Sequence, residues 1–309
     1  MTLAAPRALA DVDFVLVDFT LEFQEAFDFD LPRLLRVRRD LRAAGLLTLG
    51  DGEAFAALFD PPLSTDPAAV KRFQRPGPSF VIHPDLALCD AYEEGDQMSL
   101  SVLFWGRGIQ FLGAFAETLR ALGGSGLNRG EGRFELTAMA ARKPGGDQQW
   151  LWKRGRSAGP LVPPILSAAW WLESLPVLGE QACLEFVTPA RLLSQGRPLF
   201  RPTFASLFPF ILRRVTSMIH AHCGLEIIAD PRPWQRAAGE VLILGNELHW
   251  QDWRTLDGQA GPQELGGLVG RLRVEGESLP CLGWLLHLGS LLQLGKGASF
   301  GAGCYRVDA

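Results

Sequence analysis

The feature that most constrains the fold of this chain is an internal repeat. Its first copy runs from an alternating strand pattern through an apolar helical pattern and a glycine-rich loop to a second strand: "DQMSLSVLFWG", "IQFLGAFAETLRALGG", "SGLNRGEG" and "RFELTAMAA". The second copy keeps this order near the C-terminus: "LGGLVGRLRVEG", "LPCLGWLLHLGSLLQLG", "KGASFGAG" and "CYRVDA". A coincidence of generic elements is the alternative, but the glycine clusters fall at the same place in both copies, which favours a duplication.

Each copy is preceded by a further predicted strand and helix. In the first half these are "DFVLVDFTLEF" and "DLPRLLRVRRDLRAAG", where Asp30 can cap the helix and Pro32 lies in its first turn. In the second half they are "ACLEFVTPARL" and "SLFPFILRRVTSMIHAHCG", which ends in a glycine suited to the position after a helix. Two βαββαβ units predict an α+β fold of tandem ferredoxin-like (RRM-like) domains with glycine-rich loops.

The domain boundaries follow from composition. We place the N-terminal domain at residues 1–142 and the C-terminal domain, with its glycine-rich loop, at residues 183–309. Residues 143–182 are rich in Pro, Gly and basic side chains and are predicted to be a linker or hinge. A chain of 309 residues that is 47% hydrophobic is long enough to bury two such cores.

Composition also restricts the setting and the partners. The five cysteines form no C-x-x-C pair, so we expect neither a zinc site nor a disulfide framework, and a reducing cytoplasm is the simplest location. No signal-peptide pattern opens the sequence, and its longest apolar run is too short for a bilayer, so no membrane partner is expected. The net charge is −4, yet bases gather in "RLLRVRRDLR" and "RKPGGDQQWLWKRGR", which allows a basic face.

The C-terminal glycine-rich loop is not a nucleotide-cofactor motif. Lys296 is followed by Gly297 where a Walker loop requires Ser or Thr, and the loop leads from a helix into a strand. The spacing of Gly295, Gly297 and Gly301 also misses the dinucleotide fingerprint by one residue. We therefore expect no cofactor and no metal. Glycines still allow backbone N–H groups to approach an anion closely, so a sugar–phosphate backbone is a suitable ligand.

The stretch "LGSLLQLGKGASFGAGCYRV" resembles the signature glycine-rich loop of the RAMP superfamily (repeat-associated mysterious proteins), in particular of the CRISPR-associated endoribonucleases that process precursor crRNA. The N-terminal half resembles such proteins in "LFDPP", "RFQRPGPSFVIHP", "YEEGDQMSLSVLFWG" and "GGSGLNRGEGRFEL". The C-terminal half resembles them in "LEFVTPARL" and "SLFPFILRRVTSMI". The resemblance implies tandem ferredoxin-like folds, a crRNA repeat hairpin as ligand, and a role in antiviral defence.

The activity implied by this resemblance is metal-independent cleavage of precursor crRNA at the 3′ base of the repeat hairpin. The product would carry a 2′,3′-cyclic phosphate, and the protein would stay bound to the mature crRNA. Other subunits of a crRNA-guided effector complex are further expected partners. In many family members a histidine in or near the first helix transfers protons, whereas the first histidine of this chain is His83, well beyond that helix.

A set of arginines on the first predicted helix offers one replacement. The inward apolar stripe is Leu34, Val37, Leu41 and Ala44. The outer arcs hold Arg33, Arg36 and Arg39 on one side and Arg38 and Arg42 on the other. Five bases with one acid are unbalanced for an ordinary solvated face, which is the alternative. We take Arg38 and Arg39 as catalytic candidates that stabilise the scissile phosphate, although arginine is a poor proton acceptor.

His220 is the third catalytic candidate. The apolar positions of its predicted helix are Leu207, Ile211, Val215, Met218 and Ile219, and His222 falls among them. His220 instead lies with Arg213, Thr216 and Ser217 on the polar side. A histidine beside an arginine can act as a general acid or base near neutral pH, although an ordinary surface histidine is the alternative.

The remaining candidates are RNA contacts at the loops and the basic clusters. The predicted RNA-binding residues are Arg33, Arg36, Arg42, Arg129, Arg133, Lys153, Arg154, Arg213, Lys296, Ser299, Gly295, Gly297, Gly301 and Gly303. The tryptophans of "QQWLWKRG" can stack on splayed nucleotides or pack in a hinge. Two other functions stay open: a nuclease-silent RAMP subunit that binds crRNA within an effector complex, and a ferredoxin-like small-molecule or scaffold protein.

Overall fold

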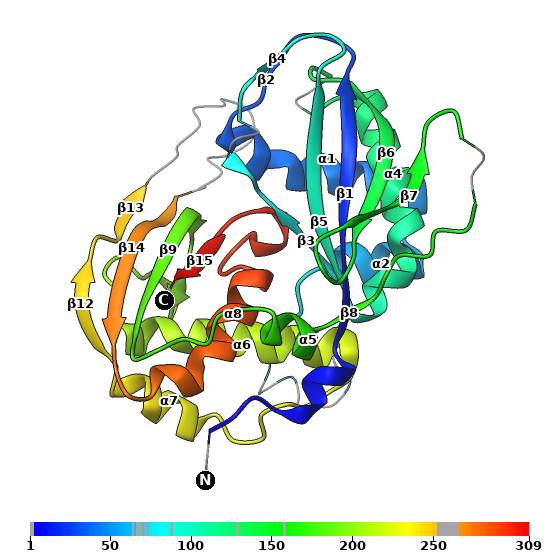
Figure 1. The fold of residues 1–309 in the computed structure, drawn as a ribbon. Coiled ribbons are helices and arrows are strands. Elements are labelled where there is room, and N and C mark those ends of the chain that lie inside the picture. The colour runs from blue at the N-terminus through cyan, green and yellow to red at the C-terminus, as the bar shows by residue number, and fades with distance from the viewer. Residues whose placement is uncertain are drawn as a thin grey trace. The chain divides into compact units, whose positions relative to one another are not determined.

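The computed structural model describes residues 3–63, 65, 70, 73, 75–86, 89–127, 130–156, 159–251 and 266–308 (Figure 1). The chain divides into two compact units. The N-terminal unit contains Asp13–Ser64 and Pro76–Ser167, and the C-terminal unit contains Met1–Val12, Thr65–Arg75 and Ala168–Ala309. None of the helices in the described ranges is long and apolar enough to cross a membrane.

The N-terminal unit is an antiparallel sheet covered by helices. Its strands follow the order β3 (Phe80–His83), β5 (Gln97–Trp105), β1 (Asp13–Phe23), β6 (Phe134–Arg142) and β7 (Gln148–Lys153), and β8 (Leu166–Ser167) pairs with the start of β1. The helices are α1 (Leu31–Leu49), α2 (Glu53–Phe59), α4 (Leu112–Ser125) and the 3-10 turn η3 (Gly106–Phe111), and a small ribbon joins β2 (Phe27–Asp28) to β4 (Ala91–Tyr92). The helices α1 and α4 pack against each other (Figure 1).

One phenylalanine joins the α4 helix to three strands of this sheet. The ring of Phe115 lies 5.5 Å from Phe19, 4.9 Å from Phe80 and 5.1 Å from Phe104, measured between ring centroids. All four side chains are buried. Tilted and edge-on contacts of this kind add to the stabilisation from apolar burial, so α4 is held at a fixed place on the sheet.

The C-terminal unit repeats this architecture. Its sheet has the order β12 (Leu242–Asn246), β14 (Gly267–Glu275), β9 (Gln181–Ala190) and β15 (Tyr305–Asp308), and β13 (His249–Gln251) pairs with β14. Its helices are α5 (Ala168–Glu173), α6 (Phe204–Cys223), α7 (Arg232–Gly239) and α8 (Leu279–Leu292), with 3-10 turns η1 (Arg7–Asp11) and η4 (Ala298–Phe300) and a ribbon of β10 (Leu193–Ser194) and β11 (Arg197–Pro198). The helices α6 and α8 pack together, and α8 contacts β15.

Both sheets have the strand order of a ferredoxin-like βαββαβ unit. The first and third strands lie in the centre, and the second and fourth lie outside them: β3-β5-β1-β6 in one unit and β12-β14-β9-β15 in the other. The predicted tandem ferredoxin-like fold is thereby confirmed. The chain adds β7 as a fifth strand at the edge of the first sheet.

The predicted helix-end signals at Asp30 and Gly224 are confirmed, and the structure adds a cap at the start of α6. Asp30 accepts a hydrogen bond of 2.7 Å from the backbone N–H of Arg33 at the start of α1. Thr203 and Ser206 form a capping box at the start of α6. Gly224 follows α6 in the left-handed conformation, with φ of 71°. The predicted inward stripe of α1 is also buried.

The predicted linker and domain boundaries differ from the structure. Residues 143–182 include β7, which pairs with β6, so this part of the linker belongs to the N-terminal sheet. The reason is that the tryptophans at alternate positions 150 and 152 favour an edge strand despite the surrounding Pro and Gly residues. Residues before Asp13 and around Phe73 belong to the C-terminal unit. His83 is the last residue of β3.

A close contact at Gly289 holds three elements of the C-terminal unit together. Tyr305 of β15 is buried, and its hydroxyl donates a 2.8 Å hydrogen bond to the carbonyl of Leu286 in α8. A Cβ atom at Gly289 would collide with that hydroxyl and would lie 2.7 Å from Cγ2 of Ile211 in α6. The absence of a side chain at position 289 therefore lets α6, α8 and β15 approach each other.

Replacing Gly289 with alanine tests this contact. The added methyl must displace Tyr305 or Ile211, so we expect Gly289→Ala to lower the free energy of unfolding by about 2 kcal/mol. The control is Gly239→Ala, since Gly239 ends α7 with no neighbour within 4 Å of a new Cβ atom. Denaturant unfolding measures both variants. Equal midpoints for the two would contradict this account.

Candidate nucleic-acid interface

The glycine-rich loop between α8 and β15 has an unusual backbone. Gly295, Gly297, Gly301 and Gly303 all have positive φ, between 64° and 92°, and Gln293 has φ of 59°. Residues with a side chain rarely adopt this conformation, so the four glycines are required by the path of the chain. The loop is thus a specific structure that could not form with ordinary residues at these positions.

The loop is fixed to the end of β9 by backbone contacts. The N–H groups of Lys296 and Gly303 donate to the carbonyls of Arg191 and Pro189, both at 3.0 Å. The buried Thr188 completes the junction, because its hydroxyl donates to the carbonyl of Gly301 at 2.7 Å and accepts from the N–H of Cys304 at 2.8 Å.

A buried arginine of α6 supports the loop through hydrogen bonds. Arg214 of α6 is 6% exposed and donates through Nε and Nη2 to the carbonyl of Leu292, at 3.2 and 3.0 Å. Its Nη2 also donates to Oγ of Ser299 at 3.2 Å. Burial lowers the pKa of Arg214 to about 10, which leaves the side chain charged at neutral pH. A cation at the C-terminus of α8 is favourable for the helix dipole.

The sequence interpretation missed Arg214, although a signal was present. Arg214 falls within the 3–4 spacing of the apolar stripe formed by Leu207, Ile211 and Met218. A charged residue at such a position must be buried with partners or leave the stripe. In this protein its partners are the carbonyl of Leu292 at the end of α8 and the hydroxyl of Ser299 in the glycine-rich loop.

The tip of the loop consists of the exposed Gly295 and Lys296 and the half-buried Gly297. The Lys296 side chain makes no ion pair with any residue in the described ranges. The N–H groups of Gly295 and Gly297 likewise donate to no acceptor in the part of the chain that the structure describes. Two backbone donors and one ammonium group at adjacent residues are groups that can bind an anion. This is the ligand chemistry predicted from the sequence.

Three predicted RNA contacts occupy other places in this loop. Ser299, Gly301 and Gly303 are buried, and Ser299 accepts the hydrogen bond from Arg214. A Cβ atom at Gly303 would collide with the carbonyl of Leu294, which explains the need for glycine at that position. We expected these three residues to contact RNA, but in the structure they are buried and shape the loop.

The arginines of α1 divide into two groups. Arg33 donates to the carbonyl of Asp28, and Arg42 donates to the carbonyl of Phe59 and to Asp60, both at 3.1 Å. Arg38 and Arg39 are exposed, and Arg39 also contacts the neighbouring Asp40 at 2.9 Å. The structure does not describe the side chain of Arg36. The exposed pair, Arg38 and Arg39, are the two predicted catalytic arginines.

Two predicted RNA contacts of the N-terminal unit are held by carboxylates. Arg133 pairs with Glu25 at 3.0 Å, and Arg154 pairs with Glu22 at 3.0 Å and Glu135 at 2.7 Å. Hydrogen bonds from the Arg133 backbone and side chain lower the pKa of Glu25. Arg129 lies outside the described residues. Lys153 is exposed at the end of β7.

His220 lies against an aromatic ring within the C-terminal unit. Its imidazole stacks on Phe73, with 4.2 Å between ring centroids and an angle of 20° between planes. A hollow beside Phe73 is lined by Arg213 and Thr216 of the same α6 face. The predicted grouping of His220 with these two residues is thus observed, but Ser217 is buried and differs from the prediction. His222 is buried as expected.

Comparison with known proteins identifies related sequences and folds. Residues 184–305 match the family model described as CRISPR-associated endoribonuclease Cas6, and residues 44–163 match a model described as an N-terminal domain. A comparison with curated protein sequences gives no match.

Several solved structures share the fold at low sequence identity. A partial Cas6-RT-Cas1–Cas2 complex matches with a TM-score of 0.59 and 14% identity, covering 99% of this chain and 47% of that one, so this chain spans about half of that relative. A Cas6 product complex from Thermus thermophilus has a TM-score of 0.51 and 17% identity, covering 96% of this chain and 100% of that one. A further Cas6 product complex has a TM-score of 0.52 and 15% identity, with 96% and 100% covered.

Replacing Arg214 tests how the loop is supported. Arg214→Met keeps an apolar stem but leaves the carbonyl of Leu292 and the hydroxyl of Ser299 without their donor. We expect the free energy of unfolding to fall by about 1–3 kcal/mol, with faster hydrogen exchange across residues 294–303. The matched control is Arg213→Met, next to it on α6 but exposed, which should change stability by less than about 0.5 kcal/mol. Unchanged exchange in Arg214→Met would refute the supporting role.

Proposed function

We propose that this chain, a CRISPR-associated protein of the Cas6 type in the RAMP superfamily, is an endoribonuclease that processes precursor CRISPR RNA. The observation that carries the proposal is the exposed loop tip at Lys296. It offers an ammonium group and two backbone donors to an anion, and it lies inside the residues that match the Cas6 family model. The ligand of this tip is a phosphate of the RNA backbone.

The proposed reaction needs no metal ion, because the RNA supplies its own nucleophile. The 2′-oxygen next to the cut attacks the neighbouring phosphorus as it loses its proton, and the 5′-oxygen of the following nucleotide leaves as it gains one. The products are a 2′,3′-cyclic phosphate and a 5′-hydroxyl. The protein must align the strand, assist both proton transfers and stabilise the extra negative charge on the phosphate.

The candidate residues suit different parts of this task. Arg38 and Arg39 are assigned to the charge that develops on phosphate, since a guanidinium group donates hydrogen bonds to phosphate oxygens. His220 is the proton-transfer candidate, since imidazole can accept and donate a proton near neutral pH. Lys296 binds and positions the RNA.

The proposed RNA is the repeat hairpin of a precursor crRNA, cut at the 3′ base of the hairpin. The mature crRNA stays bound after cleavage and can be handed to other subunits of a crRNA-guided effector complex. Positive charge on exposed sites, rather than on the whole chain, supplies the affinity.

A nuclease-silent subunit that binds crRNA is the second candidate. The observation that favours it is the absence of a histidine from α1, since the first histidine of the chain is His83 in β3. Arginine alone stabilises charge but is a poor acceptor of the 2′-hydroxyl proton. Binding without cleavage would follow if His220 does not reach the scissile phosphate.

Incubation of the purified protein with end-labelled repeat RNA in EDTA separates these functions. We expect cleavage at one site, with a 2′,3′-cyclic phosphate on the upstream product. Tight, salt-sensitive binding without cleavage would instead support the silent subunit. Absence of binding would refute both functions.

Single-turnover cleavage by four variants tests the three catalytic candidates. We expect Arg38→Ala, Arg39→Ala or His220→Ala to slow cleavage, and loss of one proton-transfer group costs about 10²–10⁴-fold. His220→Gln should be as slow as His220→Ala, because glutamine cannot transfer the proton. Full rates in all these variants would exclude the three residues from catalysis.

Lys296→Ala tests the loop tip. Loss of one phosphate contact should weaken binding to every RNA by a similar factor. It should also reduce the magnitude of the slope of log K against log salt concentration by about 1. Lys143→Ala, at an exposed turn with no assigned contact, is the control. An unchanged salt slope in Lys296→Ala would contradict the contact.

A further inference from the structure

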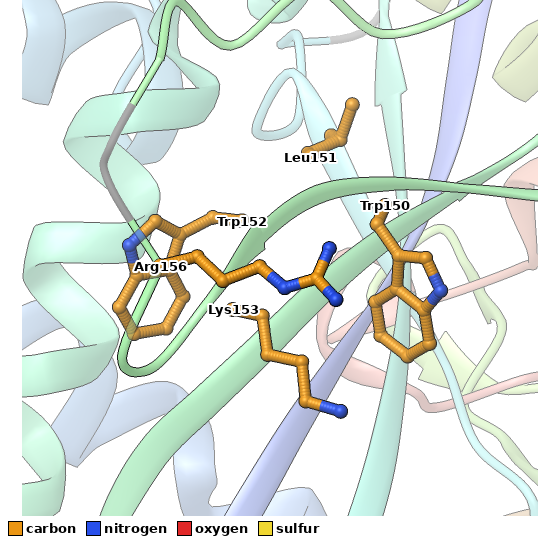
Figure 2. A pocket seen from close by; sticks show the side chains of 5 residues that line it. All are labelled: Trp150, Leu151, Trp152, Lys153 and Arg156. Carbon is orange, nitrogen blue, oxygen red and sulfur yellow. The ribbon is translucent and has the colours of Figure 1, made fainter.

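The edge strand β7 carries an exposed tryptophan within a hollow. β7 pairs with β6 on one side, and Trp150 is 57% exposed. The hollow is lined by Trp150, Leu151, Trp152, Lys153 and Arg156 and has a volume of about 190 Å³. The Arg156 side chain extends between the two indoles, and Leu151 is directed away from them (Figure 2). An indole, an ammonium group and a guanidinium group thus lie together on one surface.

The two tryptophans differ in what covers them. The guanidinium carbon of Arg120 in α4 lies 4.8 Å from the ring centroid of Trp152, which is half-buried. Trp152 therefore packs β7 against the helix. Trp150 adds little to that core, and exposed aromatic surface on a sheet edge is a liability for aggregation. Packing explains Trp152 but not Trp150.

Unpaired positive charge surrounds the exposed ring. Nζ of Lys153 lies 5.4 Å from the ring centroid of Trp150. Within the described ranges, neither Lys153 nor Arg156 has a carboxylate at ion-pair distance. The adjacent Arg154 is neutralised by Glu22 and Glu135. Two cations beside an accessible π-face are the combination that binds a nucleotide through its base and its phosphate.

We infer that this hollow on β7 binds an unpaired nucleotide of RNA, with its base stacked on Trp150 and its phosphate beside Lys153 and Arg156. The inference rests on the proposed function, in which RNA is the ligand. Stacking on an indole accepts any base, since every base has a π-face. The site therefore holds single-stranded RNA outside the base-paired hairpin and adds affinity with little sequence preference.

Two fluorescein-labelled probes test the site by anisotropy: an oligouridylate of about eight nucleotides, and the repeat hairpin without single-stranded extensions. We expect Trp150→Ala to weaken binding of the oligouridylate about tenfold, as for loss of one stacked base, and to leave hairpin binding unchanged. Trp150→Phe keeps an aromatic face and should retain most of the affinity. Ile165→Ala, at an equally exposed apolar residue of the same unit, is the control.

An abasic oligonucleotide distinguishes stacking from a change in the fold. Removal of the bases should weaken binding to the unmodified protein and have little further effect in Trp150→Ala. The β7 site is refuted if the oligouridylate binds equally to the unmodified protein and to Trp150→Ala. The proposed function stands in that case, provided that the hairpin still binds. An equal loss for both probes also refutes a separate single-strand site. If no RNA binds the unmodified protein, the proposed function itself fails.

Discussion

The C-terminal unit depends on a backbone-to-backbone contact that only glycine permits. Where the loop meets the end of β9, a Cβ atom at Gly295 would lie 2.6 Å from the carbonyl oxygen of Arg191. The same junction is closed by hydrogen bonds from Lys296 and Gly303 to β9. Since β9 is a central strand of the sheet and β15 follows the loop, this contact fixes both the edge of the sheet and the position of Lys296. The fixed backbone of this junction thus holds Lys296 at the exposed tip of the loop.

The positive charge that this protein can offer to a ligand depends on which arginines are already paired, and not on where arginines cluster in the sequence. The stretches rich in arginine contain side chains in three situations: engaged with carboxylates, such as Arg133; engaged with backbone carbonyls, such as Arg33; and exposed without an ion pair in the described ranges, such as Arg156. Only the last kind offers its full charge to a polyanion. A chain of net charge −4 can therefore still present positive charge to a polyanion at a few selected positions.

The fold was largely predictable because its signals are local. The duplicated order of strands, helices and glycine loops, the cap at Asp30 and the left-handed Gly224 each need only neighbouring residues to be interpreted. The strand β7 was missed because Pro and Gly on both sides masked a short alternating pattern. Arg214 and Ser299 were misjudged for a different reason: their hydrogen bond joins residues 85 positions apart, and no local pattern contains it. The sequence names the residues of the loop, but it does not show which of them are buried and shape the loop and which are exposed at its tip.

The distance along the chain between β9 and the loop has a consequence for the order of folding. Thr188 and Gly301, which hydrogen-bond each other, are separated by 113 residues. Contacts of such long range form slowly, since a long segment must be ordered before they stabilise anything. During synthesis the end of β9 leaves the ribosome well before the loop, so the junction cannot form until the segment up to Gly301 has followed. A nascent chain therefore reaches the final backbone setting of Lys296 only after the loop has joined the end of β9.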